Sequence, residues 1–199
     1  MKVIGITGGV GSGKSQVLAF MKEQFGAVVC QADHVAWKLQ EPGGKCYCDI
    51  VEYFGTGILN GDKTINRKEL GAIVFGDDAK LKVLNAIMHP EVKKEISSRI
   101  EMEKTTGTKL FVLEAALLIE EHYNEICDEV WYINADEKIR RQRLKTSRDY
   151  TDEKIEAIMA SQLSEWEFRK VCHRVIDNSG AFEDICVQIE DLMKQLGEN

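Results

Sequence analysis

Residues 2–15 read KVIGITGGVGSGKS, and this stretch is the most informative in the chain. An apolar run at residues 2–7 leads directly into residues 8–15, which fit the pattern G-x-x-x-x-G-K-[ST] of a P-loop. The segment that follows places Val17, Leu18 and Met21 at helical spacing. A P-loop requires this order of strand, loop and helix, so the context argues against a chance glycine turn. The motif predicts a site for the phosphates of a nucleotide.

The residues of the loop supply two kinds of contact to phosphate. Its glycines let backbone N–H groups curl around phosphate oxygens, and the N-terminus of the following helix adds partial positive charge. Lys14 is expected to reach the β- and γ-phosphates, and Ser15 to offer its hydroxyl to Mg²⁺.

The composition limits the classes of partner. The chain has 199 residues and a formal net charge of −7, so no global attraction to nucleic acid or to an anionic membrane is expected. No apolar run approaches the ~20 residues that span a bilayer, and the start of the chain has the pattern of a strand rather than a signal peptide. The six cysteines form no C-x-x-C pair, which favours free thiols in a reducing cytosol over a structural metal. We therefore expect a cytoplasmic protein with no obligate protein partner.

Short apolar runs predict a parallel sheet. Five β-like segments alternate with helical patterns, which is typical of a doubly wound α/β fold; they lie at residues 2–7, 27–32, 109–113, 129–133 and 174–177. In such sheets ligands bind beyond the carboxyl ends of the strands. Polar residues follow these ends, so they are expected on one rim: Asp33, Glu114, Asn134 and Asn178.

The chain divides into a core and two further parts. The core is expected at about residues 1–33, 107–137 and 171–199, and residues 34–106 are too long for one crossover helix. This insert is predicted to hold several helices and to contribute a site for an acceptor substrate, although a purely structural insert remains the alternative. One of its breaks is expected at His89-Pro90, with Pro90 in the first turn of a helix that runs to about Lys104.

Residues 138–148 read KIRRQRLKTSR, a basic run in an otherwise acidic chain. Thr151 has the features of a helix N-cap, and helical spacing continues beyond it. A charge run of this kind is usually a solvated helix face. Because a phosphate site is already predicted, we favour a lid, at about residues 138–170, that brings arginines onto the triphosphate.

The remaining motifs narrow the class of P-loop protein. A GTPase should carry an Asn/Thr-Lys-x-Asp motif after a late strand, and the nearest segment, residues 134–137, lacks the lysine. A small chain with a P-loop, a helical insert and a basic lid favours a small-molecule phosphotransferase instead.

The residues resemble the dephospho-coenzyme A kinase family over nearly the whole chain. No single block beyond the P-loop is diagnostic, but the order and spacing of the blocks are specific: ITGGVGSGKS at 6–15, QADHVA at 31–36, FG and IL within 54–59, INRKEL at 65–70, VF at 74–75, HPEV at 89–92, LEAALLIE at 113–120, the basic run with SQL at 161–163, and VIDNSG at 175–180.

The resemblance implies an ATP-dependent transferase that phosphorylates the ribose 3′-hydroxyl of dephospho-CoA, the last step of coenzyme A biosynthesis. It also implies a P-loop kinase of the nucleoside-monophosphate-kinase type, with a five-stranded core, a helical domain for the acceptor and a lid. The expected small-molecule ligands are therefore ATP, Mg²⁺ and dephospho-CoA.

The resemblance and the chemistry together assign roles to residues. Asp33 is the candidate to orient or deprotonate the acceptor hydroxyl, with capping of the next helix as the alternative. Lys14 is the second catalytic candidate, because its charge would neutralise the transferring phosphoryl group. The expected ATP-binding residues are Gly9, Gly11, Ser12, Gly13, Lys14, Ser15, Gln16, Arg143, Arg148 and Asn178.

Three residues are predicted near the acceptor. Arg67 and His89 match family positions in the insert, although His89 is equally compatible with an N-cap or a satisfied polar residue. Glu114 is expected either to hold Mg²⁺ through water or to pair with a lysine.

The Asn178 loop is equally compatible with contacts near the adenine of ATP and with a plain strand-to-helix turn.

The sequence departs from the family pattern at several positions. Gln31 stands where an Asp is usual, so Asp33 carries the catalytic assignment alone. The other departures are Gln16 after the P-loop serine, Ala116 in place of a proline, and Ser147 and Ile158 in place of lid arginines. The alternatives are another P-loop kinase with a different small acceptor, and a nucleotide-binding regulator that has lost catalysis.

Overall fold

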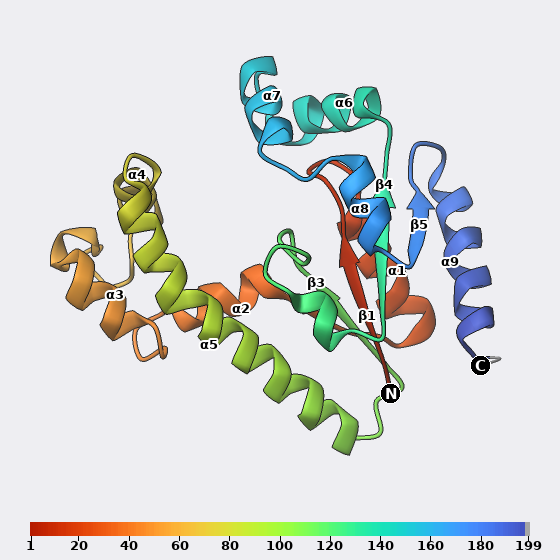
Figure 1. Cartoon of the computed structure of the whole chain (residues 1–199), viewed down its shortest axis with the longest axis horizontal. Coiled ribbons are helices and arrows are strands. Elements are labelled where there is room, and N and C mark those ends of the chain that lie inside the picture. The colour runs from red at the N-terminus through yellow and green to blue at the C-terminus, as the bar shows by residue number, and fades with distance from the viewer. Residues whose placement is uncertain (198–199) are drawn as a thin grey trace. The chain divides into compact units, whose positions relative to one another are not determined.

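The computed structural model of the chain describes residues 1–197 and contains one five-stranded sheet (Figure 1). The strand order is β2-β3-β1-β4-β5, and β1 pairs in parallel with β3 and β4, as β4 does with β5. The strands are β1 (Lys2–Thr7), β2 (Val28–Gln31), β3 (Leu110–Glu114), β4 (Glu129–Asn134) and β5 (Arg174–Asp177). The predicted α/β fold with five strands is confirmed.

The core of the sheet explains why the first strand and helix form where they do. Ile4 and Ile6 of β1 are buried, as expected for a central parallel strand with both faces covered. They pack in one cluster with buried residues of α1 (Lys14–Phe25) and α9 (Phe182–Gly197), among them Met21 and Ile185. Burial of this apolar helix face fixes α1, and so fixes the loop that precedes it.

The chain separates into two compact units. One unit comprises Met1–Val29 and the chain from Thr106 onward, and the other is Cys30–Thr105. We call the second the helical unit. Its elements are α2 (Ala32–Leu39), α3 (Tyr47–Phe54), η1 (Thr56–Ile58), α4 (Arg67–Phe75) and α5 (Asp78–Thr105). Both α2 and α4 pack on α5.

Helix α5 corrects one prediction. Pro90 does not lie in a first turn but inside α5, which continues for 28 residues without a break at His89-Pro90. A proline in a helix removes one backbone hydrogen bond and disfavours the preceding turn. Here Met88 and Val92, on either side of it, are both buried, as is Ile96. Packing on both sides of Pro90 therefore holds the helix together where local sequence rules predict a break.

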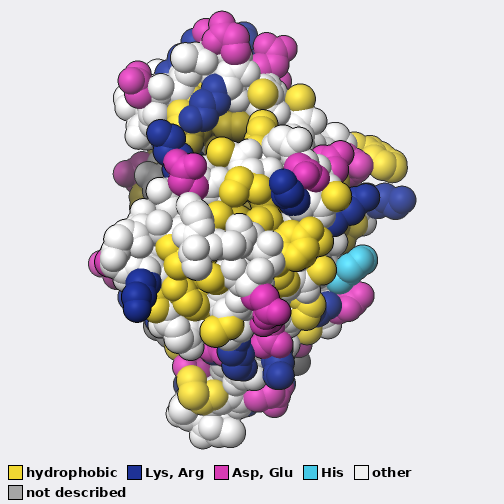
Figure 2. Space-filling view, turned by 90° about the vertical axis from the view of Figure 1, so that its left-hand side faces the viewer, with side chains coloured by type: hydrophobic (Ala, Val, Ile, Leu, Met, Phe, Trp, Pro, Cys, Tyr) yellow, Lys and Arg dark blue, Asp and Glu magenta, His cyan; other side chains and the backbone are white. Residues whose placement is uncertain are grey.

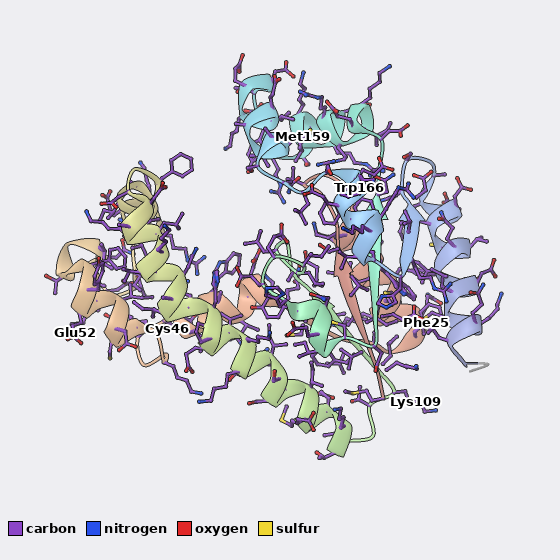
Figure 3. All side chains as sticks on the ribbon, viewed as in Figure 1. Phe25, Cys46, Glu52, Lys109, Met159 and Trp166 are labelled. Atoms are coloured by element: carbon purple, nitrogen blue, oxygen red, sulfur yellow. The ribbon has the colours of Figure 1, made fainter. Side chains whose placement is uncertain are left out.

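The basic run forms a helix, and more helices follow it. Residues Glu137–Arg148 are α6, and they lead to α7 (Asp152–Ala160) and α8 (Glu165–Val171), on which Trp166 is seen in Figure 3. Thr151 caps α7, as predicted, by accepting a hydrogen bond from the Lys154 N–H. The remaining element is η2 (Tyr123–Ile126).

The visible surface carries both signs of charge, and the cysteines carry free thiols. Figure 2 shows one face, on which basic and acidic side chains are interspersed rather than gathered by sign. Within residues 1–197, no helix combines the length and the apolar character needed to cross a membrane. All six cysteines are free thiols, and burial raises the pKa of Cys127 and Cys172 to about 12.

Candidate active site

The N-terminus of α1 is built to receive an anion. Its N-cap, Gly13, has left-handed backbone geometry and offers no side-chain cap, and the first turn contains no acidic residue. The first N–H groups of the helix and its positive dipole end are therefore left without a carboxylate of their own. By contrast, α7 and α8 have both a side-chain cap and acidic residues in their first turns. This difference makes the N-terminus of α1 the candidate anion site.

Two glycines of the loop are required by their surroundings. Gly8 has φ 150°, and a Cβ at this position would collide with the backbone carbonyl oxygen of Ile133 in β4. Gly13 has φ 88°, and a Cβ there would collide with the side-chain amide of Asn178. At these two positions the loop therefore lies so close to the ends of β4 and β5 that a side chain would not fit.

Lys14 lies over the loop that precedes it. Its Nζ donates a hydrogen bond to the Gly8 carbonyl oxygen at 2.8 Å and lies 3.8 Å from Glu114 Oε1. Glu114 is the last residue of β3 and is only 8% exposed. The sequence left two partners open for Glu114, Mg²⁺ through water or a lysine. In this structure its carboxylate pairs with Lys14.

Arginines of α6 donate hydrogen bonds to the backbone of the loop. The Arg140 guanidinium donates to the Val10 carbonyl oxygen at 2.9 Å and to Gln162 Oε1 at 3.0 Å. The same Gln162 oxygen accepts the Val10 N–H at 3.1 Å. Burial lowers the pKa of the Arg140 guanidinium. Arg140 and Gln162 therefore form a clamp on the backbone of Val10.

The two lid arginines predicted from sequence lie in different places. Arg143 donates to the Asn178 carbonyl oxygen at 3.0 Å and, more weakly, to the Ser12 carbonyl oxygen at 3.5 Å. Arg148 is the last residue of α6, and its guanidinium lies 5.9 Å from the centroid of the Tyr150 ring. Arg140 was missed by sequence reasoning. Because α6 begins soon after β4, its first turns are nearest to the carboxyl edge of the sheet, and this signal favours Arg140 over Arg148.

Asn178 also supports the backbone of the loop through a hydrogen bond. It is 1% exposed, and its Nδ2 donates to the Ser12 carbonyl oxygen at 2.7 Å. Its backbone N–H donates to the Asn134 carbonyl oxygen at 2.8 Å, which ties the end of β5 to the end of β4. The hydroxyl of Ser12 itself is buried and has no hydrogen-bond partner among residues 1–197. The loop backbone is thus held by buried donors, while one polar group in it is left without a protein partner.

The donor set at the loop fits Mg²⁺. Ser15, the second residue of α1, is exposed, and the carboxylate of Glu114 lies beside Lys14. Residues 1–197 contain no group of three or more His, Cys, Asp or Glu that could hold a metal ion by themselves. Mg²⁺ is commonly bound through one or two oxygen ligands of the protein, with substrate phosphates and water completing its shell. One hydroxyl and one carboxylate are compatible with that mode.

The helical unit holds the other predicted residues. Asp33 is exposed in the first turn of α2, but the N-cap is Gln31, so Asp33 is not the capping residue. Arg67 is the first residue of α4, and its guanidinium lies 4.5 Å from the centroid of the Trp37 ring. His89 is half-buried within α5, which excludes the N-cap alternative for it.

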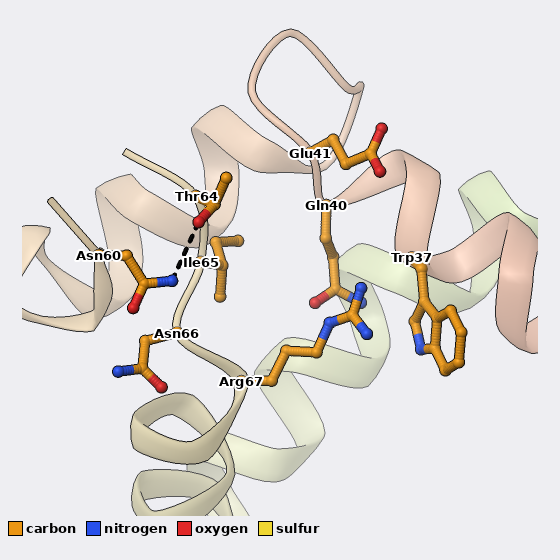
Figure 4. Close-up of a pocket in the computed structure, with 8 residues that line it drawn as sticks. All are labelled: Trp37, Gln40, Glu41, Asn60, Thr64, Ile65, Asn66 and Arg67. Carbon is orange, nitrogen blue, oxygen red and sulfur yellow. Dashed lines mark hydrogen bonds between the residues drawn. The ribbon is translucent and has the colours of Figure 1, made fainter. Parts of the chain in front are cut away.

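A cavity of about 400 Å³ lies in the helical unit (Figure 4). Side chains from the end of α2 and from the segment that leads into α4 form its wall: Trp37, Gln40, Glu41, Asn60, Thr64, Ile65, Asn66 and Arg67. Of the residues predicted to bind the acceptor, Arg67 is on this wall, and His89 is not among its lining residues. No sequence motif pointed to Trp37.

Comparisons with known proteins agree with the resemblance inferred from the residues. The family model of dephospho-CoA kinases matches residues 2–184. The dephospho-CoA kinase of Lactobacillus johnsonii is 35% identical over 194 residues, which cover 98% of each chain. Among solved structures, TT1252 from Thermus thermophilus has a TM-score of 0.81 at 29% identity and covers 98% of this chain and 97% of its own.

A further solved structure shares the fold. The dephospho-CoA kinase of Campylobacter jejuni has a TM-score of 0.74 at 24% identity and covers 99% of this chain and 100% of its own. The family match extends over nearly all of the chain, including the P-loop, both ends of the helical unit and the basic helix α6. The chain therefore belongs to the dephospho-CoA kinase family, a family of ATP-dependent phosphotransferases that complete coenzyme A biosynthesis.

Proposed function

We propose that the loop at residues 8–15 grips the triphosphate of ATP together with Mg²⁺, while Asp33 directs the ribose 3′-hydroxyl of dephospho-CoA at the γ-phosphorus. The observation that carries the first half is the uncapped N-terminus of α1, which follows a buried strand and presents Lys14. The products are coenzyme A and ADP.

The reaction is a direct displacement at phosphorus. The oxygen of the 3′-hydroxyl forms a bond to the γ-phosphorus, and the bond from that phosphorus to the β,γ-bridging oxygen breaks. The hydroxyl proton passes to the Asp33 carboxylate, and ADP leaves with the electron pair of the broken bond. Such transfers have little covalent chemistry for the protein to perform, so catalysis consists of positioning and of stabilising charge.

Lys14 and the loop amides supply most of that stabilisation. The ammonium group lies above the loop, 2.8 Å from the Gly8 carbonyl oxygen, in reach of phosphate oxygens held by the amides. Ser15 and, through water, Glu114 would hold Mg²⁺, which supplies further positive charge to the phosphates when it is bound. Arg143 is proposed to neutralise phosphate charge from α6, which is supported by its place beside the Ser12 carbonyl. Arg148 is proposed for the same role on the basis of its charge alone.

Asp33 is the candidate base because of where it stands in the chain. It follows β2 within the first turn of α2, and the carboxyl ends of parallel strands share one edge of a sheet. Its side chain is exposed and does not cap the helix, so its structural contribution is limited to the favourable effect of an acidic residue on the helix dipole. Gln31, two residues earlier, carries no charge, which leaves a single carboxylate for the task.

The remaining assignments complete the proposal. The helical unit is proposed to bind the acceptor, with Arg67 and His89 among the contacts, and residues 138–170 are proposed to act as a lid. Gly9, Gly11, Gly13 and Gln16 are proposed to contact ATP through backbone N–H groups. A cytoplasmic location is proposed on the six free thiols, which suit a reducing compartment.

The test is to identify the product. We expect the chain, given ATP, Mg²⁺ and dephospho-CoA, to release one ADP for each acceptor that gains one phosphoryl group, with the new phosphate on the ribose 3′-oxygen. A coupled assay measures the ADP, and mass spectrometry with phosphorus NMR locates the phosphate. A panel of nucleosides, nucleotides and sugar acids provides the comparison. Turnover with one of these and none with dephospho-CoA would overturn the proposal, as would ATP binding without any transfer.

A further inference from the structure

The cavity of the helical unit contains one proposed acceptor contact, Arg67, and the chemistry of the rest of its wall indicates which part of the acceptor it binds. The first feature of that wall is a flat stacking surface. The indole of Trp37 is 43% exposed, and the Arg67 guanidinium lies 4.5 Å from its centroid (Figure 4). The His34 ring lies 4.9 Å from the indole on the same helix. Exposed aromatic rings and guanidinium planes are the surfaces on which proteins stack nucleobases.

The second feature is a set of hydrogen-bond acceptors on the wall. The Gln40 side-chain amide donates to the Ala36 carbonyl oxygen at 3.2 Å, and the Asn60 amide donates to Thr64 Oγ1 at 2.9 Å. The Thr64 hydroxyl in turn donates to Asp62 at 2.6 Å. One N–H of each amide is used within the protein, and the wall offers the side-chain oxygens of Gln40 and Asn60 and the carboxylate of Glu41. It also carries donors, the Arg67 guanidinium and the amide of Asn66, whose oxygen caps α4. Oxygens of this kind suit a ligand with N–H donors.

The third feature is the charge balance. Arg67 and Glu41 are the charged residues among those that line the cavity, and their charges are opposite. A site for phosphate or pyrophosphate would be expected to have surplus positive charge, as the loop at residues 8–15 has with Lys14. The cavity therefore favours a planar, uncharged group with exocyclic N–H donors over a phosphate.

The fourth feature is the spacing along α2. Trp37 is four residues after Asp33, so both side chains belong to one helix face, with Cβ atoms roughly 5–6 Å apart. In dephospho-CoA the base is attached at C1′ and the reacting hydroxyl at C3′, with one ring carbon between them. The pantetheine arm leaves from C5′ through a pyrophosphate. A hydroxyl at Asp33 thus leaves the base within reach of Trp37, whereas the pantetheine begins only beyond the pyrophosphate.

We propose that this cavity binds the adenine base of dephospho-CoA. Trp37 and Arg67 stack against the ring, and the oxygens of Gln40, Glu41 and Asn60 face its 6-amino group. The inference rests on the proposed function through the role of Asp33. It makes Trp37 and Glu41 specificity residues for the acceptor and gives them no contact with ATP.

Titration calorimetry of Trp37→Ala tests this assignment. With the ATP site filled by a non-hydrolysable ATP analogue and Mg²⁺, we expect the variant to bind dephospho-CoA and AMP about tenfold or more weakly than the wild type, because a stacking partner is lost. Binding of 4′-phosphopantetheine and the KM for ATP should not change. Trp37→Phe should retain most of the affinity, and Tyr53→Ala, an exposed aromatic of the same unit, should bind all ligands as the wild type does.

The outcomes separate the two levels of the proposal. If Trp37→Ala binds dephospho-CoA as tightly as the wild type, the adenine assignment is wrong. If it loses 4′-phosphopantetheine while AMP binding is unchanged, the cavity holds the pantetheine arm instead. If the KM for ATP rises, the cavity belongs to the other nucleotide. Each of these results leaves the proposed function intact when the wild type still converts dephospho-CoA, whereas failure of that conversion removes the proposed function itself.

Discussion

The loop at residues 8–15 and the cavity of the helical unit are proposed to recognise ligands in different ways. The loop uses consecutive residues, mostly through their backbone, and is held by buried donors such as Asn178 and by the half-buried Arg140. The cavity uses side chains from α2 and from the segment before α4, several of them exposed. The first kind of site appears in sequence as a motif, and the second does not.

The difference also concerns energetics. Support for the loop is buried, so damage to it should reduce both the stability of the fold and the handling of ATP. The wall of the cavity is largely at the surface, where substitutions usually change stability little. We therefore expect variants of the two regions to separate into two classes, one that affects ATP and one that affects the acceptor.

Lys14→Ala should have the largest effect. It removes a positive charge from the proposed phosphate site, and loss of one group that stabilises transition-state charge typically lowers kcat by about 10²–10³. Steady-state kinetics with dephospho-CoA measures the loss. Lys22→Ala, at the other end of the same helix, is the matched control and should retain full activity. A Lys14→Ala variant within tenfold of wild type would mean that the loop does not act on the reacting phosphate.

Asn178→Ala should have a smaller effect of a different kind. It deletes the short hydrogen bond to the Ser12 carbonyl oxygen and leaves that oxygen only the long contact from Arg143. Poor satisfaction of a buried acceptor costs up to about 1–3 kcal/mol. We expect a lower free energy of unfolding and a higher KM for ATP, with little change in the KM for dephospho-CoA. Denaturant titration and kinetics measure the two.

A nearly isosteric variant separates the hydrogen bond from the volume of the side chain. Asn178→Asp keeps the size but lacks the N–H donor, so it should be at least as damaging as the alanine variant. If either variant is as stable as the wild type, the buried hydrogen bond does not support the loop.

Much of the fold could be predicted from the sequence because it depends on local patterns. The five strands and the P-loop follow from short apolar runs and from one motif, and all of them are present. The helix break at Pro90 was predicted wrongly because the rule for proline is local, whereas packing of Met88 and Val92 on both sides is not. Tertiary contacts outweighed the local preference there.

The candidate site could be predicted from the sequence only in part. Arg140 and Gln162 are separated by 22 residues, and packing brings them to each other and to the backbone of Val10, so their clamp has no signature in the sequence. Trp37 and Arg67 come from different helices and meet in the same way. Side chains brought together by packing require the structure, whereas backbone sites within one turn of chain do not.

Asp33 is the residue at which the two regions are proposed to work on one reaction, and Asp33→Asn tests it most directly. Loss of a general base typically lowers the rate by about 10²–10⁴. We predict a fall in kcat of this size with an unchanged KM for ATP, while Asp49→Asn, in the first turn of α3, keeps wild-type kinetics. A kcat for Asp33→Asn equal to that of the wild type would contradict the account, because no other carboxylate has been assigned to the acceptor hydroxyl.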